Sequence, residues 1–554
     1  MKRLTSIYEL NQKVHETGSH SELWETAFLE ADFRSENHVT EASTLSVQPH
    51  YVRIKQLFDG SFIMLYNELK NSDGVRMLRS EDGYSWGEYS TVFAPTETKR
   101  YANPEAIVLK NGDILCCAAW RIVPDYLTDN SKGGIEIKRS SDNGRTWSEE
   151  QLVFTGLTWE PYFLQLRSGE LQLYWTNTTR YNLPNGNNTS TGTAMLRSFD
   201  NGYTWTGDPH VPYSGQVVAK QATECYDGVQ FYTDQMPVAI ELQNGTIALS
   251  LESRLDRKGN CYISMAYSDD NWAESIPLDG EGPADKLTNM NRGGGPYLAQ
   301  FPSGETVLHH AFCKIYRMRI GDPTAKKFTT EAIKHKGMTN FSSFEPLKNG
   351  HSVLCSGSYP YRDAEDKEYF DVCTIRMHLD HAVFLDRAEY TAEGGVDWEK
   401  VDQALFLGSE SQAQMSLRFA ETEKGLGIRF DRLDYDITSA DTCGLRISLS
   451  EDKSDYIELT VGPHGIAENG AISVKNGVQS EISVACHVTL FGTVDNGEDK
   501  DEGYIAELMI PKEYLPESYS VYPMLHNEDS ADLARDTGMM PISDNIKWIP
   551  VISE

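Results

Sequence analysis

Long apolar runs are missing from this sequence, and basic residues are outnumbered by acidic ones. No segment of the 554 residues approaches the length of an apolar helix that crosses a membrane. The 50 Lys and Arg residues face 82 Asp and Glu residues, a formal net charge of −32. A field of this sign repels nucleic acids and anionic lipids, so we expect neither nucleic acid nor membrane as a partner. A neutral substrate meets no such barrier, whereas an anionic substrate needs a local cluster of Arg.

Cysteine pairs at the spacing of a metal motif are missing as well. None of the nine cysteines lies in a Cys-x-x-Cys pair, so the sequence indicates neither a zinc motif nor a disulfide framework, and we expect no metal ion and no cofactor. The first residues, "MKRLTSIYELNQKVHETG", begin with two basic residues but have no apolar run behind them. We therefore expect no signal peptide and a cytoplasmic location, or secretion if a leader has been removed. No pattern fixes the oligomeric state.

What the sequence does contain is a repeat of about 60 residues. Four segments share a box of Ser, Asp and Trp: "SEDGYSW" from Ser80, "SSDNGRTW" from Ser140, "SFDNGYTW" from Ser198 and the contracted "SDDNW" from Ser268. The box suits a hairpin turn, because Asp accepts backbone N–H groups, Gly supplies positive φ and Trp covers the hydrophobic edge. We expect these boxes to be structural and to lie on outer turns.

A second pattern recurs six times, as a Gly flanked on both sides by alternating hydrophobic residues. Such alternation predicts two antiparallel strands joined by a tight turn. The six glycines are Gly60, Gly112, Gly169, Gly245, Gly304 and Gly350. Each repeat then holds an inner hairpin at the Gly turn and, in at least four cases, an outer hairpin at the box. Six four-stranded units predict an all-β fold, a six-bladed β-propeller over residues 1–385.

The repeat stops near residue 386. Later segments such as "SLRFAETEKGLGIRFDRLDYD", "DYIELTVG" and "GYIAELMIPKEYL" alternate like the strands of a sandwich. Residues 386–554 are therefore predicted to form a second, β-sandwich domain.

Acidic residues stand where the innermost strands of the propeller begin or end. In "GLTWEPYFLQLRSG", Glu160 precedes a strand that leads to Gly169, so its side chain is expected to face the central channel. Glu252 closes the apolar strand "GTIALSLESR" and is followed by Arg254. Two carboxylates from neighbouring blades that face one channel are what glycoside hydrolysis needs, because one protonates the leaving oxygen and the other attacks carbon or activates water. Further acids near the channel are Glu105, Asp234 and Glu345.

The boxes and the six-blade period resemble the sialidase superfamily of propellers. Within it, "WEPYFLQLRSG" and "QMPVAIELQNGTIALSLE" resemble the exo-α-1,5-arabinanases of glycoside hydrolase family 93. This resemblance implies Glu160 as general acid/base and Glu252 as nucleophile, in an exo-acting hydrolase of a plant-type oligosaccharide with α-L-arabinosyl linkages. The last domain, with "YIAELMIPKEYLP" and "MLHNED", is similar to carbohydrate-binding modules of family 9. Sugar binding and a docking or stabilising role are both open for that domain.

The predicted substrate-binding residues surround the same channel. Trp159 and Tyr162 are aromatic residues that could stack on a sugar face. The full set is Arg53, Glu105, Trp159, Tyr162, Asp234, Arg254 and Tyr297.

Two alternative functions follow from the same residues. A sialidase or related ulosonic-acid hydrolase binds a carboxylate through three Arg and uses a Tyr paired with Glu as nucleophile. Arg53 and Ile54 match the first arginine segment, but Lys55 replaces its proline. The other alternative is a propeller that binds carbohydrate without catalysis.

Overall fold

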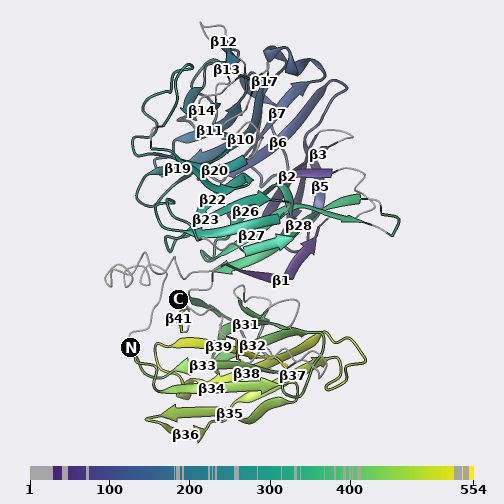
Figure 1. Cartoon of the computed structure of the whole chain (residues 1–554), viewed down its shortest axis with the longest axis vertical. Coiled ribbons are helices and arrows are strands. Elements are labelled where there is room, and N and C mark those ends of the chain that lie inside the picture. Colours follow the sequence, from purple (N-terminus) through teal and green to yellow (C-terminus); the bar gives the residue numbers. More distant parts are fainter. Residues whose placement is uncertain are drawn as a thin grey trace. The chain divides into compact units, whose positions relative to one another are not determined.

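The protein is described from a computed structural model, in which two compact units can be distinguished (Figure 1). One unit comprises residues 33–376, and the other comprises residues 1–32 and 377–554. The boundary falls in two strands that pair with each other, β1 (Leu29–His38) and β28 (Glu368–Leu379). The structure describes residues 29–39, 48–69, 74–179, 181–182, 188–189, 192–221, 225–226, 229–230, 234–254, 261–283, 285–313, 315–329, 333–336, 338–362, 364–366, 368–379, 382–390, 395–398, 401, 404–408, 413–528, 539–540 and 548–553.

Six four-stranded antiparallel sheets make up the larger unit (Figure 1). The first three, each from its innermost strand outward, are β2 (Gln48–Gln56), β3 (Phe62–Leu69), β4 (Val75–Ser80) and β5 (Gly87–Phe93); β6 (Lys99–Val108), β7 (Ile114–Ile122), β8 (Gly133–Ser140) and β9 (Gln151–Thr155); and β10 (Thr158–Gln165), β11 (Leu171–Asn177), β14 (Gly192–Ser198) and β15 (Gln216–Ala219).

The other three sheets follow the same plan. They are β18 (Gln235–Glu241), β19 (Ile247–Arg254), β20 (Cys261–Ser268) and β21 (Leu287–Arg292); β22 (Gly294–Gln300), β23 (Thr306–Phe312), β24 (Ile315–Gly321) and β25 (Ile333–Lys336); and β26 (Thr339–Pro346), β27 (Ser352–Arg362), β28 and β1. Two short hairpins lie in connections, β12 (Tyr181–Asn182) with β13 (Asn188–Thr189) and β16 (Cys225–Tyr226) with β17 (Val229–Gln230). The predicted six-bladed propeller is confirmed.

The innermost strands contact one another in a closed circle, in the order β2, β6, β10, β18, β22, β26 and back to β2. Apolar residues of adjacent blades pack together between the sheets; Leu57 and Ile63 of the first blade, for example, share a cluster with Ala106 and Ile114 of the second. The sixth blade takes its outermost strand, β1, from the start of the chain. The ring is therefore closed by pairing the two ends of the repeat region.

The six glycines lie in the turns between the first and second strands, as the alternation predicted. Gly169, for example, has a φ of 97° and donates its N–H to the carbonyl of Leu166, and the other five glycines repeat this bond with the residue three positions earlier. A positive φ of this size is accessible to Gly at no steric cost.

Side chains at the same level join neighbouring blades. The backbone N–H of Lys110 donates to the Gln165 side chain of the next blade at 2.9 Å, and the N–H of Lys348 in the last blade donates to Gln56 in the first at 2.8 Å. The acceptor stands four residues before the turn glycine, a position that holds Gln56, Gln165, Glu241 and Gln300 in the four blades that make this bond.

The Ser/Asp/Trp boxes lie between the third and fourth strands, on the outer hairpins. In the first box the Ser80 hydroxyl donates to Asp82 and accepts the backbone N–H of Gly83 at 2.8 Å. The box tryptophans pack against clusters shared with the preceding blade, as Trp147 does against the cluster of the first and second blades. These contacts agree with the structural role expected for the boxes.

The second unit contains a 13-stranded arrangement in which β29 (Val383–Arg387) pairs in parallel with both β31 (Ala413–Glu421) and β41 (Ile549–Ser553). Its buried core includes Phe419, Phe430 and Tyr504. The other strands are β30 (Leu405–Gly408), β32 (Gly425–Asp434), β33 (Thr442–Ser448), β34 (Tyr456–Gly462), β35 (Gly465–Lys475), β36 (Val478–Glu481), β37 (Ala485–Phe491), β38 (Gly503–Pro511), β39 (Ser520–His526) and β40 (Met539–Met540).

Helical structure is confined to three-residue 3₁₀ turns among the residues described. Within that part of the chain, no helix has the length and apolar character required to span a membrane.

The first box gives a direct test of the turn chemistry. Ser80→Ala removes the acceptor of a buried N–H, so we expect a loss of about 1–3 kcal/mol in the free energy of unfolding. Ser85→Ala changes an exposed residue of the same turn and serves as the matched control. Urea unfolding followed by tryptophan fluorescence measures both; equal midpoints for the two variants would contradict the assigned role of Ser80.

Candidate active site

One backbone feature recurs at the start of every innermost strand. Each strand carries a bulge, and inside or beside it one residue has a φ between 44° and 64°. In all six blades this residue stands nine positions before the turn glycine. A bulge re-aims side chains, and a left-handed residue other than Gly costs on the order of 1–3 kcal/mol, so such positions cluster at functional sites. The six residues are Tyr51, Asn103, Glu160, Met236, Gly295 and Phe341.

Glu160 occupies this position in the third blade, with a φ of 44°. Its Oε1 accepts a hydrogen bond from the Tyr51 hydroxyl at 3.1 Å. The pKa of Glu160 is raised to about 7: burial is the largest cause, the nearby Glu252 charge adds to the rise, and the hydrogen bonds from Thr176 and Tyr51 oppose it. A carboxyl group with this pKa exchanges its proton near neutral pH, which suits a general acid and base.

Glu252 lies near the end of β19 in the fourth blade and is 7 % exposed. Its Oε2 accepts the backbone N–H of Gly295 at 2.9 Å, and its Oε1 accepts the side-chain amide of Gln235. A Cβ placed on Gly294 would collide with Oε2 of Glu252, so the absence of a side chain at residue 294 makes room for the carboxylate. Both oxygens are thus held by donors from the fourth and fifth blades.

A continuous set of contacts connects the two acids. Tyr51, which bonds Glu160, stacks on Phe341 with ring centroids 4.4 Å apart. A Cβ on Gly295 would lie 3.7 Å from Cα of Phe341 and 3.8 Å from Cε of Met236.

The circle closes through Met236. Its backbone N–H donates to Thr176 Oγ1 at 2.8 Å, and the Thr176 hydroxyl bonds Glu160. Five of the six left-handed residues therefore gather around one mouth of the channel, and Glu160 and Glu252 belong to that mouth.

Below this level, charged residues fill the channel. Arg53 is 7 % exposed and donates to Glu105 at 2.8 Å and to the carbonyl oxygens of Val52 and Phe341. Lys55 donates to the Tyr297 hydroxyl at 3.0 Å and pairs with Glu105 at 3.3 Å and with Glu345 at 3.6 Å. These bonds involve Arg53, Glu105 and Tyr297, three of the predicted substrate-binding residues, in contacts within the protein.

The far side of this layer opens into a cavity of about 620 Å³, lined by residues of all six innermost strands. Tyr162 and Tyr297 meet edge to face at its wall, with ring centroids 5.8 Å apart. The cavity lies toward the Gly turns, because Phe301 and Pro302 of the fifth turn line it. Tyr162 therefore borders the cavity at the opposite end of the channel from Glu160.

Two of the remaining predicted residues, Trp159 and Asp234, also make contacts within the protein. Trp159 donates its indole N–H to Thr178 at 3.1 Å, and the Arg121 guanidinium lies 3.8 Å from the centroid of its ring. Asp234 is fully buried, bonds Ser253 at 2.6 Å and pairs with Lys286. The backbone of Arg254 pairs with Cys261, while its side chain lies outside the described residues.

Several residues at the mouth were not singled out from the sequence. They are Tyr51, Thr176, Gln235, Gly294, Gly295 and Phe341. Three of them, Tyr51, Gly295 and Phe341, share with Glu160 the spacing of nine residues before a turn glycine. Counting back from each glycine would have found them.

The raised pKa of Glu160 predicts a pH-dependent effect on stability. Because the folded-state pKa of about 7 lies above the ordinary value of 4.5, the protonated carboxyl stabilises the fold below pH 4.5, and this contribution is lost as the pH rises through 7. Glu160→Gln is neutral at every pH, so relative to wild type it should gain up to about 3 kcal/mol between pH 4 and pH 8. Urea midpoints at several pH values measure this, with Glu241→Gln as the control; a parallel pH course in all three proteins would contradict the assigned pKa.

No protein-family model and no curated protein matches the chain. Among solved structures, the chain is similar to a protein of unknown function from Dyadobacter fermentans (15 % identity, TM-score 0.46, 62 % of this chain and 98 % of that one). It is also similar to an α-L-arabinanase from Penicillium chrysogenum complexed with arabinobiose (18 %, 0.43, 61 % and 97 %) and to the NanB sialidase from Streptococcus pneumoniae (10 %, 0.44, 62 % and 71 %). At these identities and TM-scores the likeness assigns no activity to this chain.

Proposed function

We propose that the protein is an exo-acting glycoside hydrolase of a neutral plant-type oligosaccharide, with α-L-arabinosyl linkages as the leading substrate. The observation that carries the proposal is the pair of carboxyl groups at one mouth of the channel, in contrasting surroundings. Glu160 has a pKa near 7 because it is buried, whereas Glu252 is held through both oxygens by N–H donors. The arabinosyl linkage and the exo mode rest on the resemblance of the two Glu segments to family 93.

In the proposed first step, Glu160 gives its proton to the leaving glycosidic oxygen while Glu252 attacks the anomeric carbon. The carbon–oxygen bond breaks, and a glycosyl ester on Glu252 forms. In the second step the Glu160 carboxylate takes a proton from water, and the resulting hydroxide displaces Glu252 from the same carbon. Each residue returns to its starting state, and the anomeric configuration is retained.

The charge of the channel supports a neutral substrate. Arg121 lies over the Trp159 ring beside Glu160 and donates to the Asn103 side chain at 3.0 Å. Arg53 and Lys55, two cations of the layer beneath the mouth, are paired with Glu105 and Glu345. Their fields are therefore largely cancelled before they reach a sugar, and a substrate carboxylate gains little from them.

The sialidase alternative is supported by one specific contact. The Tyr51 hydroxyl bonds Glu160 at 3.1 Å, and a Tyr paired with Glu is the nucleophile that the sialidase resemblance implies. In that case Tyr51 attacks and Glu160 accepts its proton, so release of sialic acid would replace arabinose release.

Activity on linear arabino-oligosaccharides tests the proposal. Glu160→Gln should lower kcat by about 10²–10⁴-fold, and less on a substrate whose leaving group needs no proton. Glu252→Gln should lower turnover at least as much, both on the arabino-oligosaccharide and on the substrate whose leaving group needs no proton, because the covalent step is lost.

Glu241→Gln is the matched control for these variants. It neutralises another carboxylate of an innermost strand, and three other blades hold Gln at its position, so activity should be unchanged. Wild-type rates in Glu160→Gln or Glu252→Gln would remove the mechanism. Release of sialic acid by the wild type would favour the alternative, and sugar binding without turnover would indicate a binding propeller.

The pH profile provides a second test. A general acid must be protonated, so kcat should fall as the pH rises through about 7. The Tyr51 hydrogen bond lowers the pKa of Glu160, so Tyr51→Phe should move this alkaline limb to higher pH. Tyr89 lies on the outermost strand β5, and its hydroxyl donates to Glu68. Tyr89→Phe should therefore leave the alkaline limb in place. An unshifted limb in Tyr51→Phe would show that Tyr51 does not tune Glu160, and loss of all turnover would favour Tyr51 as nucleophile.

A further inference from the structure

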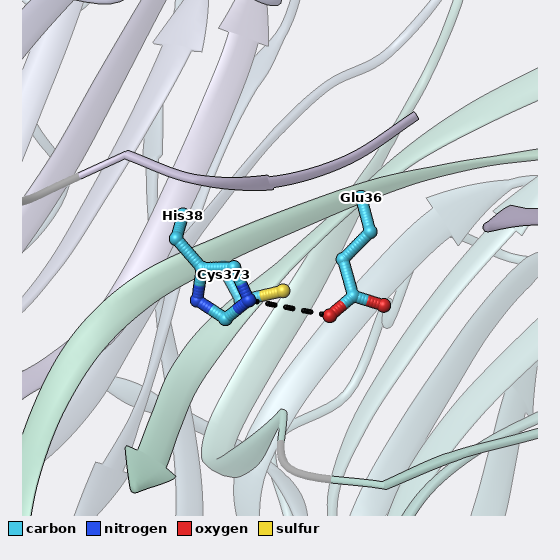
Figure 2. A group of neighbouring side chains, drawn as sticks. All are labelled: Glu36, His38 and Cys373. Carbon is cyan, nitrogen blue, oxygen red and sulfur yellow. Dashed lines mark hydrogen bonds and ion pairs between the residues drawn. The ribbon is translucent and has the colours of Figure 1, made fainter. Parts of the chain in front are cut away.

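A second cluster of reactive side chains lies at the outer edge of the sixth blade, where β1 pairs with β28. Glu36 and His38 stand two residues apart on β1, and Asp371 and Cys373 stand two residues apart on β28. Residues two apart on a strand share a face, so each strand contributes one pair. Figure 2 shows the Glu36 carboxylate directed at the His38 ring, with Cys373 beside that ring.

The ligand atoms are close enough to share one ion. One oxygen of Glu36, one ring nitrogen of His38 and the sulfur of Cys373 all lie within 4.8 Å of one another. Bonds of 2.0–2.3 Å to a tetrahedral zinc ion set ligand separations of about 3.3–3.8 Å. Side-chain rotations that move the ligand atoms by about 1 Å would therefore bring them to bonding distance of one ion. Cys373 is fully buried, whereas the His38 side chain is 41 % exposed, which leaves a path for the ion and for water.

Two neighbours orient the ligands. Asp371 Oδ2 lies 2.7 Å from Nδ1 of His38, on the side of the ring away from Nε2, which faces Oε1 of Glu36 at 3.3 Å. A carboxylate behind the far nitrogen of a histidine is the usual support of a metal-binding imidazole. On the other side, His335 Nε2 lies 2.9 Å from Oε2 of Glu36 and holds the second oxygen of that carboxylate.

The cluster also has more electron-pair donors than hydrogen-bond donors. Asp371 is 6 % exposed, and its Oδ1 has no hydrogen-bond partner among the described residues. A buried carboxylate oxygen that no N–H or O–H group satisfies is stabilised by a cation nearby.

We propose that Glu36, His38 and Cys373 bind a divalent cation of the zinc class, with water as the fourth ligand and with Asp371 and His335 supporting the site. The combination of thiolate, imidazole and carboxylate favours zinc over magnesium or calcium, which take oxygen ligands. The ion joins β1 to β28 and so fastens the strand that closes the ring. The site lies on the two outer strands of the sixth blade rather than at the channel.

The sequence did not indicate this site, and we expected no metal ion. That expectation rested on the absence of Cys-x-x-Cys pairs, whereas these ligands come from segments about 340 residues apart.

Cobalt(II) is a suitable probe, because a thiolate ligand gives it a charge-transfer absorption band. We expect the full chain, purified without a histidine tag, to bind one cobalt ion and to show this band. Zinc should displace the cobalt ion and remove the band. Cys373→Ala should lose the band. Cys355→Ala removes another buried thiol, from the adjacent strand β27, and should keep it. Asp371→Asn leaves the three ligands in place and should weaken binding about 10–100-fold.

Stability gives an independent readout. Saturating zinc should raise the unfolding temperature of the wild type and of Cys355→Ala, a chelator should reverse the rise, and Glu36→Gln should respond less. If Cys373→Ala fails to fold, Glu36→Gln, which changes a partly exposed side chain, carries the test alone. Cobalt spectra without the charge-transfer band, a band that survives in Cys373→Ala, or an unfolding temperature indifferent to zinc would each overturn the proposal.

Discussion

The candidate site depends on a single backbone constraint that is applied six times. Each innermost strand interrupts its alternation with a bulge and a left-handed residue, always nine residues before the glycine turn. Without the bulge, a regular strand would send successive side chains to opposite faces and no blade could direct an extra group at the mouth. Glu160 and Tyr51 occupy two of these positions, and Gly295 occupies a third, from which its N–H reaches Glu252. Chemistry at the mouth is therefore set by which residue each blade places there.

The layer beneath the mouth explains why the acids, rather than the cations, define the site. Arg53 is bonded to Glu105 and to two carbonyl groups, and Lys55 lies between Glu105, Glu345 and Tyr297. Removing one member of such a buried pair leaves the other uncompensated, so these residues act together as the floor of the mouth. Glu160 lies above that floor, and burial is the largest influence on its pKa.

The sequence predicted the blades well because the signals are local. A glycine turn flanked by alternating residues, or a Ser/Asp/Trp box, is fixed by neighbours within ten residues, and both appeared where expected. It also located Glu160 at an innermost strand. The partners of Glu160 and Glu252 could not be predicted in the same way, because Tyr51 and Gly295 come from other blades, and only the ring brings them together. Arg53 was expected near the substrate because it matches the first arginine segment of sialidases, and Asp234 because it precedes an innermost strand. Their burial and ion pairs depend on Glu105 and Lys286, which are distant in sequence.

The closing strand carries a consequence for how the chain is assembled. β1 precedes every other strand of the propeller in the chain, yet its partner β28 is the last propeller strand to be synthesised. Until β28 is available, the hydrogen-bonding groups of β1 have no sheet to join, and open strand edges promote association between chains. The ring thus closes in one late step, when β1 pairs with β28. Translation that stops before residue 368 leaves five complete blades and an open ring.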